Sequence, residues 1–223
     1  MSDSTFFDNK LGNGLYSVPE ISLILEMPQS KVRRYLNHFL NERIGKEIFG
    51  KEYSATIGKN KVVNFYVLME FRAFCELKKL GISTQKIFKA YTAISKDLNV
   101  PFPFANRKLL TNGRAILYRY NDLILNADGT KQANLVEIVE ALYEKIEFDD
   151  NSRAVRFFPR KDSSIIVDRH HQFGQPVIEG TNVCAKVVHS LYSAGDSVEM
   201  LSELYSLTSK QVNDAILFYA QAA

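Results

Sequence analysis

The apolar positions between residues 16 and 40 recur at helical spacing in two groups that one proline separates. Because residues three or four apart share one face of a helix, each group predicts a short amphipathic helix. The first group is Ile21, Ile24 and Leu25, and the second is Val32, Tyr35, Leu36, Phe39 and Leu40. Pro28 ends the first helix, since its ring disfavours a helical backbone at Met27. The pattern therefore predicts two helices that meet at a tight turn.

The starts of both helices carry capping signals. Ser17 and Glu20 stand three residues apart before the first apolar group, which is the spacing of a reciprocal capping box. Pro19 suits the first turn, where no backbone N–H has to be paired. Ser30 is a candidate cap for the second helix.

The second helix has a polar and basic outer face. With Val32 at the centre of the buried side, a rotation of about 100° per residue decides which residues face solvent. Opposite Val32 lie Ser30, Arg34, Asn37, His38 and Asn41, with Lys31 and Arg33 on the flanks. A short helix, a tight turn and a second helix rich in donors are what a helix-turn-helix uses on phosphates and base edges. The competing interpretation is an ordinary amphipathic helix with a solvated face.

A β-hairpin is predicted after the helix pair. A glycine-punctuated connection covers residues 41–58, and β-prone runs at 52–57 and 61–65 flank the turn around Gly58. A hairpin with a basic tip after a helix-turn-helix has the form of a wing. From that tip, Lys59 and Lys61 would reach a phosphate or the minor groove.

Two further helices complete this part of the pattern. Residues 66–79 have the apolar density of a core helix, with Gly81 as its C-terminal cap. Residues 84–98 repeat apolar positions at spacings of three and four. Pro101 and Pro103 end the unit.

In this order of parts, residues 15–98 resemble the DNA-binding half of the MerR-like winged helix family. The resemblance rests on the Val-Arg-Arg-Tyr run of the second helix and on the Leu-Gly-Ile-Ser step, residues 80–83, after the wing. It implies that the second helix is a recognition helix whose cations contact DNA. Helix, wing and resemblance together give the predicted DNA-binding set: Gln29, Ser30, Lys31, Arg33, Arg34, Asn37, Lys59 and Lys61.

The middle of the chain, residues 105–162, has mixed periodicity. Residues 112–129 predict two strands, and residues 134–146 predict an amphipathic helix with glutamates on its outer side. Two more strands are predicted at 154–158 and 164–168. We find no catalytic spacing there and interpret the segment as a dimerisation element or a support for the last domain.

The last quarter of the chain predicts a compact strand and helix unit. A strand, a Gly/Pro turn and a second strand at Pro176–Ile178 precede three short helices, which break at Gly195-Asp196 and at residues 206–208. Ser197 and Thr208 are each placed to cap the helix that follows.

This stretch closely resembles the small trihelical domain of unknown function 433 found in prokaryotic antitoxins. The matching residues are Gly174 to Pro176, Gly180, Thr181, Ala194 to Ser197, Tyr205, Leu207, Thr208 and Val212. The resemblance implies a VapB-like antitoxin of a type II toxin–antitoxin system. Its implied partner is a PIN-like toxin, a small metal-dependent ribonuclease.

Charge is divided unevenly along the chain, although the net charge is only +3. Residues 29–61 hold eight Lys or Arg against three acids, whereas residues 163–223 hold three against six. A basic end suits nucleic acid, and an acidic end suits the basic face that an RNA-binding toxin needs. The candidate toxin-binding residues are Asp168, Gln175, Glu199, Glu203 and Asp214.

Several other kinds of site are not expected. Cys75 and Cys184 lie far apart in apolar surroundings, which predicts buried thiols in a reducing compartment. Adjacent His170 and His171 near Asp168 offer no third metal ligand. No catalytic constellation, cofactor motif, signal peptide or membrane span is found, so we expect a cytoplasmic protein that is not an enzyme.

These observations predict a mainly α fold with small β elements, of the α+β class. We expect a flexible leader at 1–14, a winged helix domain at 15–104, an α+β linker or dimerisation segment at 105–162 and an antitoxin domain at 163–223. The predicted function is an antitoxin and autorepressor, a homodimer that binds operator DNA and a PIN-like toxin. The alternatives are a stand-alone MerR-like regulator whose last domain binds a ligand or protein, and, less favoured, an enzyme built on the middle segment.

Overall fold

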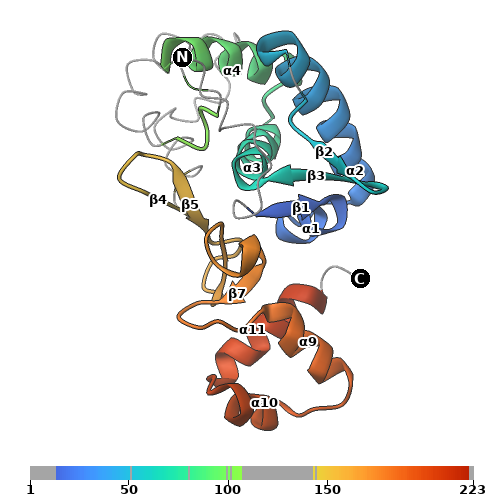
Figure 1. Ribbon diagram of the computed structural model, residues 1–223, viewed down its shortest axis with the longest axis vertical. Helices are drawn as coiled ribbons and strands as arrows, with labels where there is room; N and C mark the ends of the chain where they lie inside the picture. The colour runs from blue at the N-terminus through green and yellow to red at the C-terminus, as the bar shows by residue number, and fades with distance from the viewer. Residues whose placement is uncertain are drawn as a thin grey trace.

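The computed structural model describes residues 14–50, 52–79, 81–98, 100, 102–106, 143 and 145–220. It has the α+β fold that the sequence predicts, with helices and two small antiparallel sheets (Figure 1). The strands predicted within 112–129 and nearly all of the helix predicted at 134–146 lie outside the described residues. In the described part of the chain, no helix is long and apolar enough to cross a membrane.

The first sheet joins the start of the chain to the predicted hairpin. Its strands are β1 Leu15–Ser17, β2 Ala55–Ile57 and β3 Asn60–Asn64, in the order β1-β3-β2. β3 is therefore central, with Tyr16 opposite Val63 on one side and Thr56 opposite Lys61 on the other. The hairpin prediction is confirmed, except that Phe65 already begins the next helix.

The helix pair follows β1 directly. Helix α1 spans Val18–Ile24 and ends at Leu25, before Pro28 is reached. Helix α2 begins at Gln29 with Pro28 as its N-cap, so the prediction that Ser30 caps this helix is wrong: Ser30 already lies in its first turn. At the start of α1, the Ser17 N–H donates to Glu20 Oε2 at 2.7 Å, and the Ser17 hydroxyl donates to the same oxygen at 2.6 Å. The predicted link between these two side chains is thus present and fixes the point where the strand becomes a helix.

Beyond α2 the chain departs from the expected irregular connection. Helix α2 ends at Tyr35 but continues as a π-type helix, η2, over Leu36–Phe49, which stops at left-handed Gly50. Bonds between residues five apart widen each turn, so the 100° rotation no longer predicts the faces. Asn41, expected outside, is buried, and its side chain bonds the Ser54 N–H at 3.1 Å and the Ser54 hydroxyl at 2.7 Å.

Helix α3, Phe65–Lys79, runs through the centre of this half and is buried along most of its length. Phe74 stacks on Phe39 at 3.9 Å between ring centroids and meets Tyr35 edge-on at 4.8 Å. Gly81 follows with a φ of +82°, and the Ile82 N–H donates to Leu77 O at 3.1 Å. This is the predicted glycine cap, and it turns the chain into α4, Thr84–Leu98.

The second sheet lies between the first half and the C-terminal helices. Its strands, in spatial order, are β4 Ile146–Phe148, β5 Ala154–Phe157, β6 Ile165–Asp168 and β7 Pro176–Ile178. β5 pairs with β6, so this sheet continues across the boundary that we place at residue 162. β7 is an edge strand, which accommodates the missing N–H of Pro176.

Three helices follow the sheet with the predicted breaks. They are α9 Ala185–Ser193, α10 Val198–Tyr205 and α11 Ser209–Ala220. Ser197 Oγ accepts from the Met200 N–H at 3.2 Å, and Thr208 Oγ1 accepts from the Gln211 N–H at 3.2 Å. Both predicted caps are confirmed.

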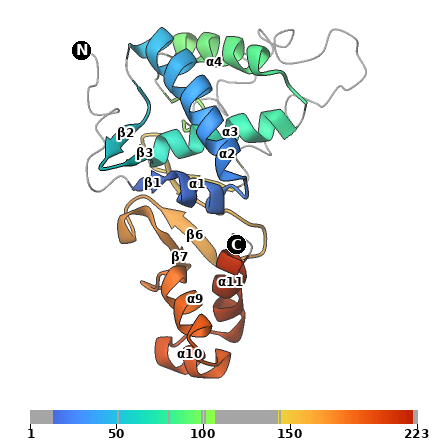
Figure 2. The ribbon, with the colours of Figure 1, turned by 90° about the vertical axis from the view of Figure 1, so that its right-hand side faces the viewer.

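The two halves are bonded to each other. Arg169, at the end of β6, lies over the Tyr66 ring at 5.0 Å and donates to the Tyr66 hydroxyl. In the short 3-10 turn η3, Gln172–Gly174, the left-handed Gly174 lies against the Tyr16 hydroxyl, which a Cβ atom there would strike. Figure 2 shows α10 at one end of the molecule and α4 at the other, with α2 between them beside α1.

Candidate nucleic-acid and protein interfaces

The first turns of α2 present the predicted donors to solvent. Val32 is completely buried, while the five polar residues around it are exposed: Gln29, Ser30, Lys31, Arg33 and Arg34. The Arg33 guanidinium donates to Gln29 Oε1 at 3.0 Å across one turn of the helix. The helix therefore offers a cationic face with an amide at its N-terminal end, a combination suited to phosphates and base edges.

An aromatic ring supports the cations of this face. The Lys31 ammonium lies 5.8 Å from the centroid of the Tyr35 ring, and the Arg34 guanidinium lies 5.2 Å from it. Tyr35 is anchored in turn against Phe74 of α3. Packing in the core thus limits the directions in which Lys31 and Arg34 extend from the helix.

The hairpin contacts the helix through one of its two predicted lysines. Lys61 Nζ donates to Asn37 Oδ1 at 2.8 Å, whereas Lys59 is exposed in the turn between β2 and β3. Asn37 and Lys61 are therefore half-buried partners that hold the β2–β3 hairpin against the helix. Lys59 is the hairpin cation that remains exposed to solvent.

The predicted acidic surface divides into exposed and internally bonded residues. Gln175, Glu199 and Glu203 are exposed. Asp168 is buried, is paired with the Arg156 guanidinium at 3.1 Å and accepts from the His170 N–H at 2.8 Å. Its carboxylate is committed to the end of β6, which leaves little of it for a partner.

Asp214 is also bonded within the molecule. Its Oδ2 accepts from the Ser164 N–H at 2.8 Å and hydroxyl at 2.5 Å, and from Lys210 Nζ at 2.7 Å. Burial alone raises the pKa of Asp214, but the bonds from Lys210 and Ser164 outweigh burial and hold the pKa below its ordinary value. Asp214 therefore holds α11 against Ser164, the residue that precedes β6.

Sequence reasoning missed the exposed apolar side chains beside these acids. Met200 and Leu204, one turn apart on α10, are 58% and 63% exposed, while Leu201 between them is fully buried. Periodicity did not reveal this, because Met200, Leu201 and Leu204 lie within about 100° of one another on the helix and read as one apolar face. A helix with apolar side chains on both an inner and an outer side has more than one contact surface.

A second missed residue is Arg160, which reaches both halves of the protein. Its guanidinium donates to Leu217 O and Phe218 O at 3.1 Å each, and it lies over the Phe218 ring at 4.7 Å. Its Nε also lies 2.7 Å from Glu26 Oε1 in the helix-turn-helix turn. Arg160 thus neutralises the end of α11 and contacts the turn before α2.

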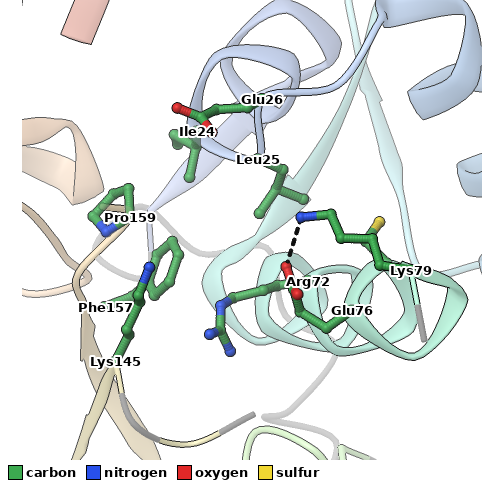
Figure 3. Close-up of a pocket in the computed structure, with 10 residues that line it drawn as sticks. Ile24, Leu25, Glu26, Arg72, Glu76, Lys79, Lys145, Phe157 and Pro159 are labelled. Carbon is green, nitrogen blue, oxygen red and sulfur yellow. Dashed lines mark hydrogen bonds and ion pairs between the residues drawn. The ribbon is translucent and has the colours of Figure 1, made fainter. Parts of the chain in front are cut away.

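A cavity of about 170 Å³ lies beside this junction, between α1, α3 and β5 (Figure 3). Within its walls Lys79 is paired with Glu76 at 2.9 Å, and the Arg72 guanidinium lies 4.9 Å from the Phe157 ring centroid. Burial raises the pKa of the Cys75 thiol in the wall to about 12, so this thiol is protonated and unreactive. The cavity has space for a small ligand.

The paired histidines do not assemble a metal centre in the described part of the chain. His171 Nε2 lies 3.1 Å from the Thr181 carbonyl oxygen, and His170 is exposed. Among the residues that the structure describes, no three His, Cys, Asp or Glu side chains are grouped to hold a metal ion.

Comparison with known proteins finds a family match in the C-terminal part and one similar protein over most of the chain. Residues 165–219 match the family described as protein of unknown function (DUF433). A Mycobacterium tuberculosis protein described as "Putative antitoxin VapB45" is 26% identical over 169 residues, which are 70% of this chain and 68% of that protein.

The fold is also similar to a solved structure. The crystal structure of Rv2018 from Mycobacterium tuberculosis superposes with a TM-score of 0.71 at 22% identity. The similarity covers 90% of this chain and 96% of that one, so nearly the whole arrangement of elements is shared. The predicted resemblance to domain of unknown function 433 is confirmed, whereas the MerR-like relationship stays a prediction.

Proposed function

We propose that this protein is an antitoxin that neutralises a PIN-like ribonuclease toxin and binds operator DNA to repress its own operon. The observation that carries the proposal is the similarity to an antitoxin, combined with the family match over the acidic helical end. The cationic face of α2, in the N-terminal half of the molecule, supports the operator half of the proposal.

The operator half rests on exposed donors held in a defined arrangement. The phosphate contacts would come from Lys31, Arg33, Arg34 and Lys59, and base edges would meet Gln29 and Ser30 at the start of α2. Asn37 and Lys61 would set the angle between helix and wing through their mutual bond. A homodimer is proposed because each half-site supplies only part of the affinity for a palindromic operator.

The toxin half rests on charge complementarity. A ribonuclease must attract RNA phosphates, so the face around its active site carries cations. The exposed Glu199 and Glu203 offer the opposite charge from one helix. An acidic helix of this kind can cover such a face and exclude RNA from it.

The direct test is neutralisation of the toxin. The purified protein is mixed with the product of the reading frame beside its own gene, and cleavage of a labelled RNA is followed. We expect cleavage to fall to background at an equimolar ratio and both proteins to elute together in gel filtration. Undiminished cleavage, together with separate elution, would contradict the antitoxin proposal.

The junction cavity favours one second candidate, a stand-alone regulator that responds to a small ligand. The cavity lies between the helix pair and β5, so an occupant would contact both halves. This candidate predicts operator binding without any toxin partner, and the neutralisation experiment separates the two.

A further inference from the structure

We propose that α10 is the surface that docks the toxin, through an apolar stripe of Met200 and Leu204 beside an acidic stripe of Glu199 and Glu203. The occupant is a protein with an apolar groove whose rim carries Lys or Arg. This inference rests on the proposed function and names the surface and the partner chemistry that serve it.

The two stripes follow from the geometry of a short helix. Residues four apart lie one above the other, so Met200 and Leu204 form one line and Glu199 and Glu203 form the next. Leu201 faces inward and packs in the core, which fixes the rotation of α10. The apolar line therefore lies outside the core, between the buried side of the helix and its acidic line.

Two neighbouring apolar side chains with such large exposed fractions are unusual on a helix that binds no partner. Met200 and Leu204 keep 58% and 63% of their surface exposed, although both belong to an eight-residue helix. Single exposed apolar residues are common, but neighbouring ones rimmed by charge mark interaction sites. Methionine adapts its shape to a partner, and leucine supplies a fixed anchor.

Charge decides between the possible occupants. α10 carries two acids and no base. A hydrogen bond from the backbone of Glu199 itself, and a second one from the Ser197 side chain, lower the pKa of the Glu199 carboxyl, so this acid stays ionised. A second copy of the chain, related by a two-fold axis, would bring the acidic lines against each other and be repelled. A basic partner is attracted instead, and a PIN-like ribonuclease is basic where RNA binds.

The location of α10 in the molecule also bears on function. α10 lies at the end of the molecule away from α2 and the wing (Figures 1 and 2). A protein seated on α10 therefore leaves the candidate DNA-binding face uncovered.

The test is calorimetric titration of the full-length protein with a catalytically inactive form of the neighbouring reading-frame product. The test variant is Met200→Gln with Leu204→Gln, which keeps side-chain length and helix propensity. The matched control is Leu217→Gln, because Leu217 is 55% exposed on α11, outside the stripe. We expect the double variant to bind at least about 30-fold more weakly, as loss of central anchors does, and the control to bind like wild type.

A second variant tests the acidic line independently of the apolar one. Glu199→Lys with Glu203→Lys should weaken binding most at low salt, since salt screens the charges that it reverses. Circular dichroism melting of each variant confirms that the fold is retained.

The outcomes separate the docking surface from the proposed function. If wild type binds and both the apolar and the charge-reversal variants bind equally well, α10 is not the docking surface, while the antitoxin function stands. If wild type does not bind, both proposals fail. If the double variant only converts a dimer into a monomer in sedimentation, with unchanged toxin affinity, the stripe is a self-association surface and the inference is overturned.

Discussion

At the scale of single residues, two carboxylates of the same charge have different roles because their surroundings differ. Glu203 is exposed on α10, while Asp214 accepts bonds from Ser164 and Lys210. The count of acidic residues in the sequence assigned both of them to one acidic surface. Only the first is available to a partner, because the second would have to give up its internal bonds.

Replacement of Asp214 should therefore change stability and its dependence on pH. Hydrogen bonds to a charged group each contribute about 1.5–3 kcal/mol, so Asp214→Asn should lower the free energy of unfolding by roughly that amount at neutral pH. The pKa of Asp214 is lowered in the folded state. The stability that Asp214 contributes is therefore complete above its unfolded pKa of 3.8, and it is lost as pH falls through the folded pKa.

Urea unfolding at several pH values measures this effect, with Glu203→Gln as the control. The gap between wild type and Asp214→Asn should be constant above about pH 5 and shrink in acid. The Glu203→Gln protein should match wild type throughout. A gap that widens in acid would show that Asp214 is not stabilised as an anion.

At the scale of elements, Arg160 is the contact that connects α11 with the helix-turn-helix turn. The Arg160 side chain is only 17% exposed where it bonds the Leu217 and Phe218 carbonyl oxygens and packs on Phe218, whereas the Glu26 side chain is 56% exposed. Exposed ion pairs contribute little, about 0–1 kcal/mol. Arg160 should therefore stabilise the fold mainly through its contacts with α11.

A double-mutant cycle of Glu26→Gln and Arg160→Gln checks this division. We expect Arg160→Gln alone to cost about 1–3 kcal/mol, Glu26→Gln to cost less than about 1 kcal/mol, and their coupling to stay below about 1 kcal/mol. Thermal and urea unfolding provide the values. A coupling as large as the whole Arg160 effect would mean that the ion pair, and not α11, is the main contact of this side chain.

The elements that the sequence predicts correctly are those with local signals. The bounds of α4 and β7, the Ser17–Glu20 link and the Ser197 and Thr208 caps all depend on residues within a few positions of each other. The extension of α2 into η2 was missed, since glycines at 45 and 50 suggest an irregular segment. Helical rotation then placed Asn41 outside, although the wider π-type turn buries it.

The candidate sites show the same division between local and distant information. Exposure of the cations on α2 follows from periodicity around Val32. The internal roles of Asn37, Asp168 and Asp214 depend on Lys61, Arg156 and Ser164, which lie 24, 12 and 50 residues away in sequence. Neither periodicity, which selected Asn37, nor the count of charges, which selected Asp168 and Asp214, contains information about such partners.

At the scale of the whole molecule, the proposed function uses two surfaces in different parts of the fold. Helix α10 lies at one end, and α2 lies in the N-terminal half beside α1, with β6 and β7 between the two parts (Figure 2). Contacts through Arg160, Arg169 and Gly174 hold these parts in one arrangement. DNA and toxin should therefore bind at the same time without steric conflict.

The most direct measurement of this account is a mobility shift of the labelled promoter of the protein's own operon, with toxin then added. Wild type should shift the DNA, and the toxin should shift the complex further. Arg34→Ala should weaken the first shift and lower the slope of log affinity against log salt by about 1, since one phosphate contact is lost. A first shift that is absent, or that is indifferent to salt and to Arg34, or toxin that never joins the DNA complex, would contradict the account.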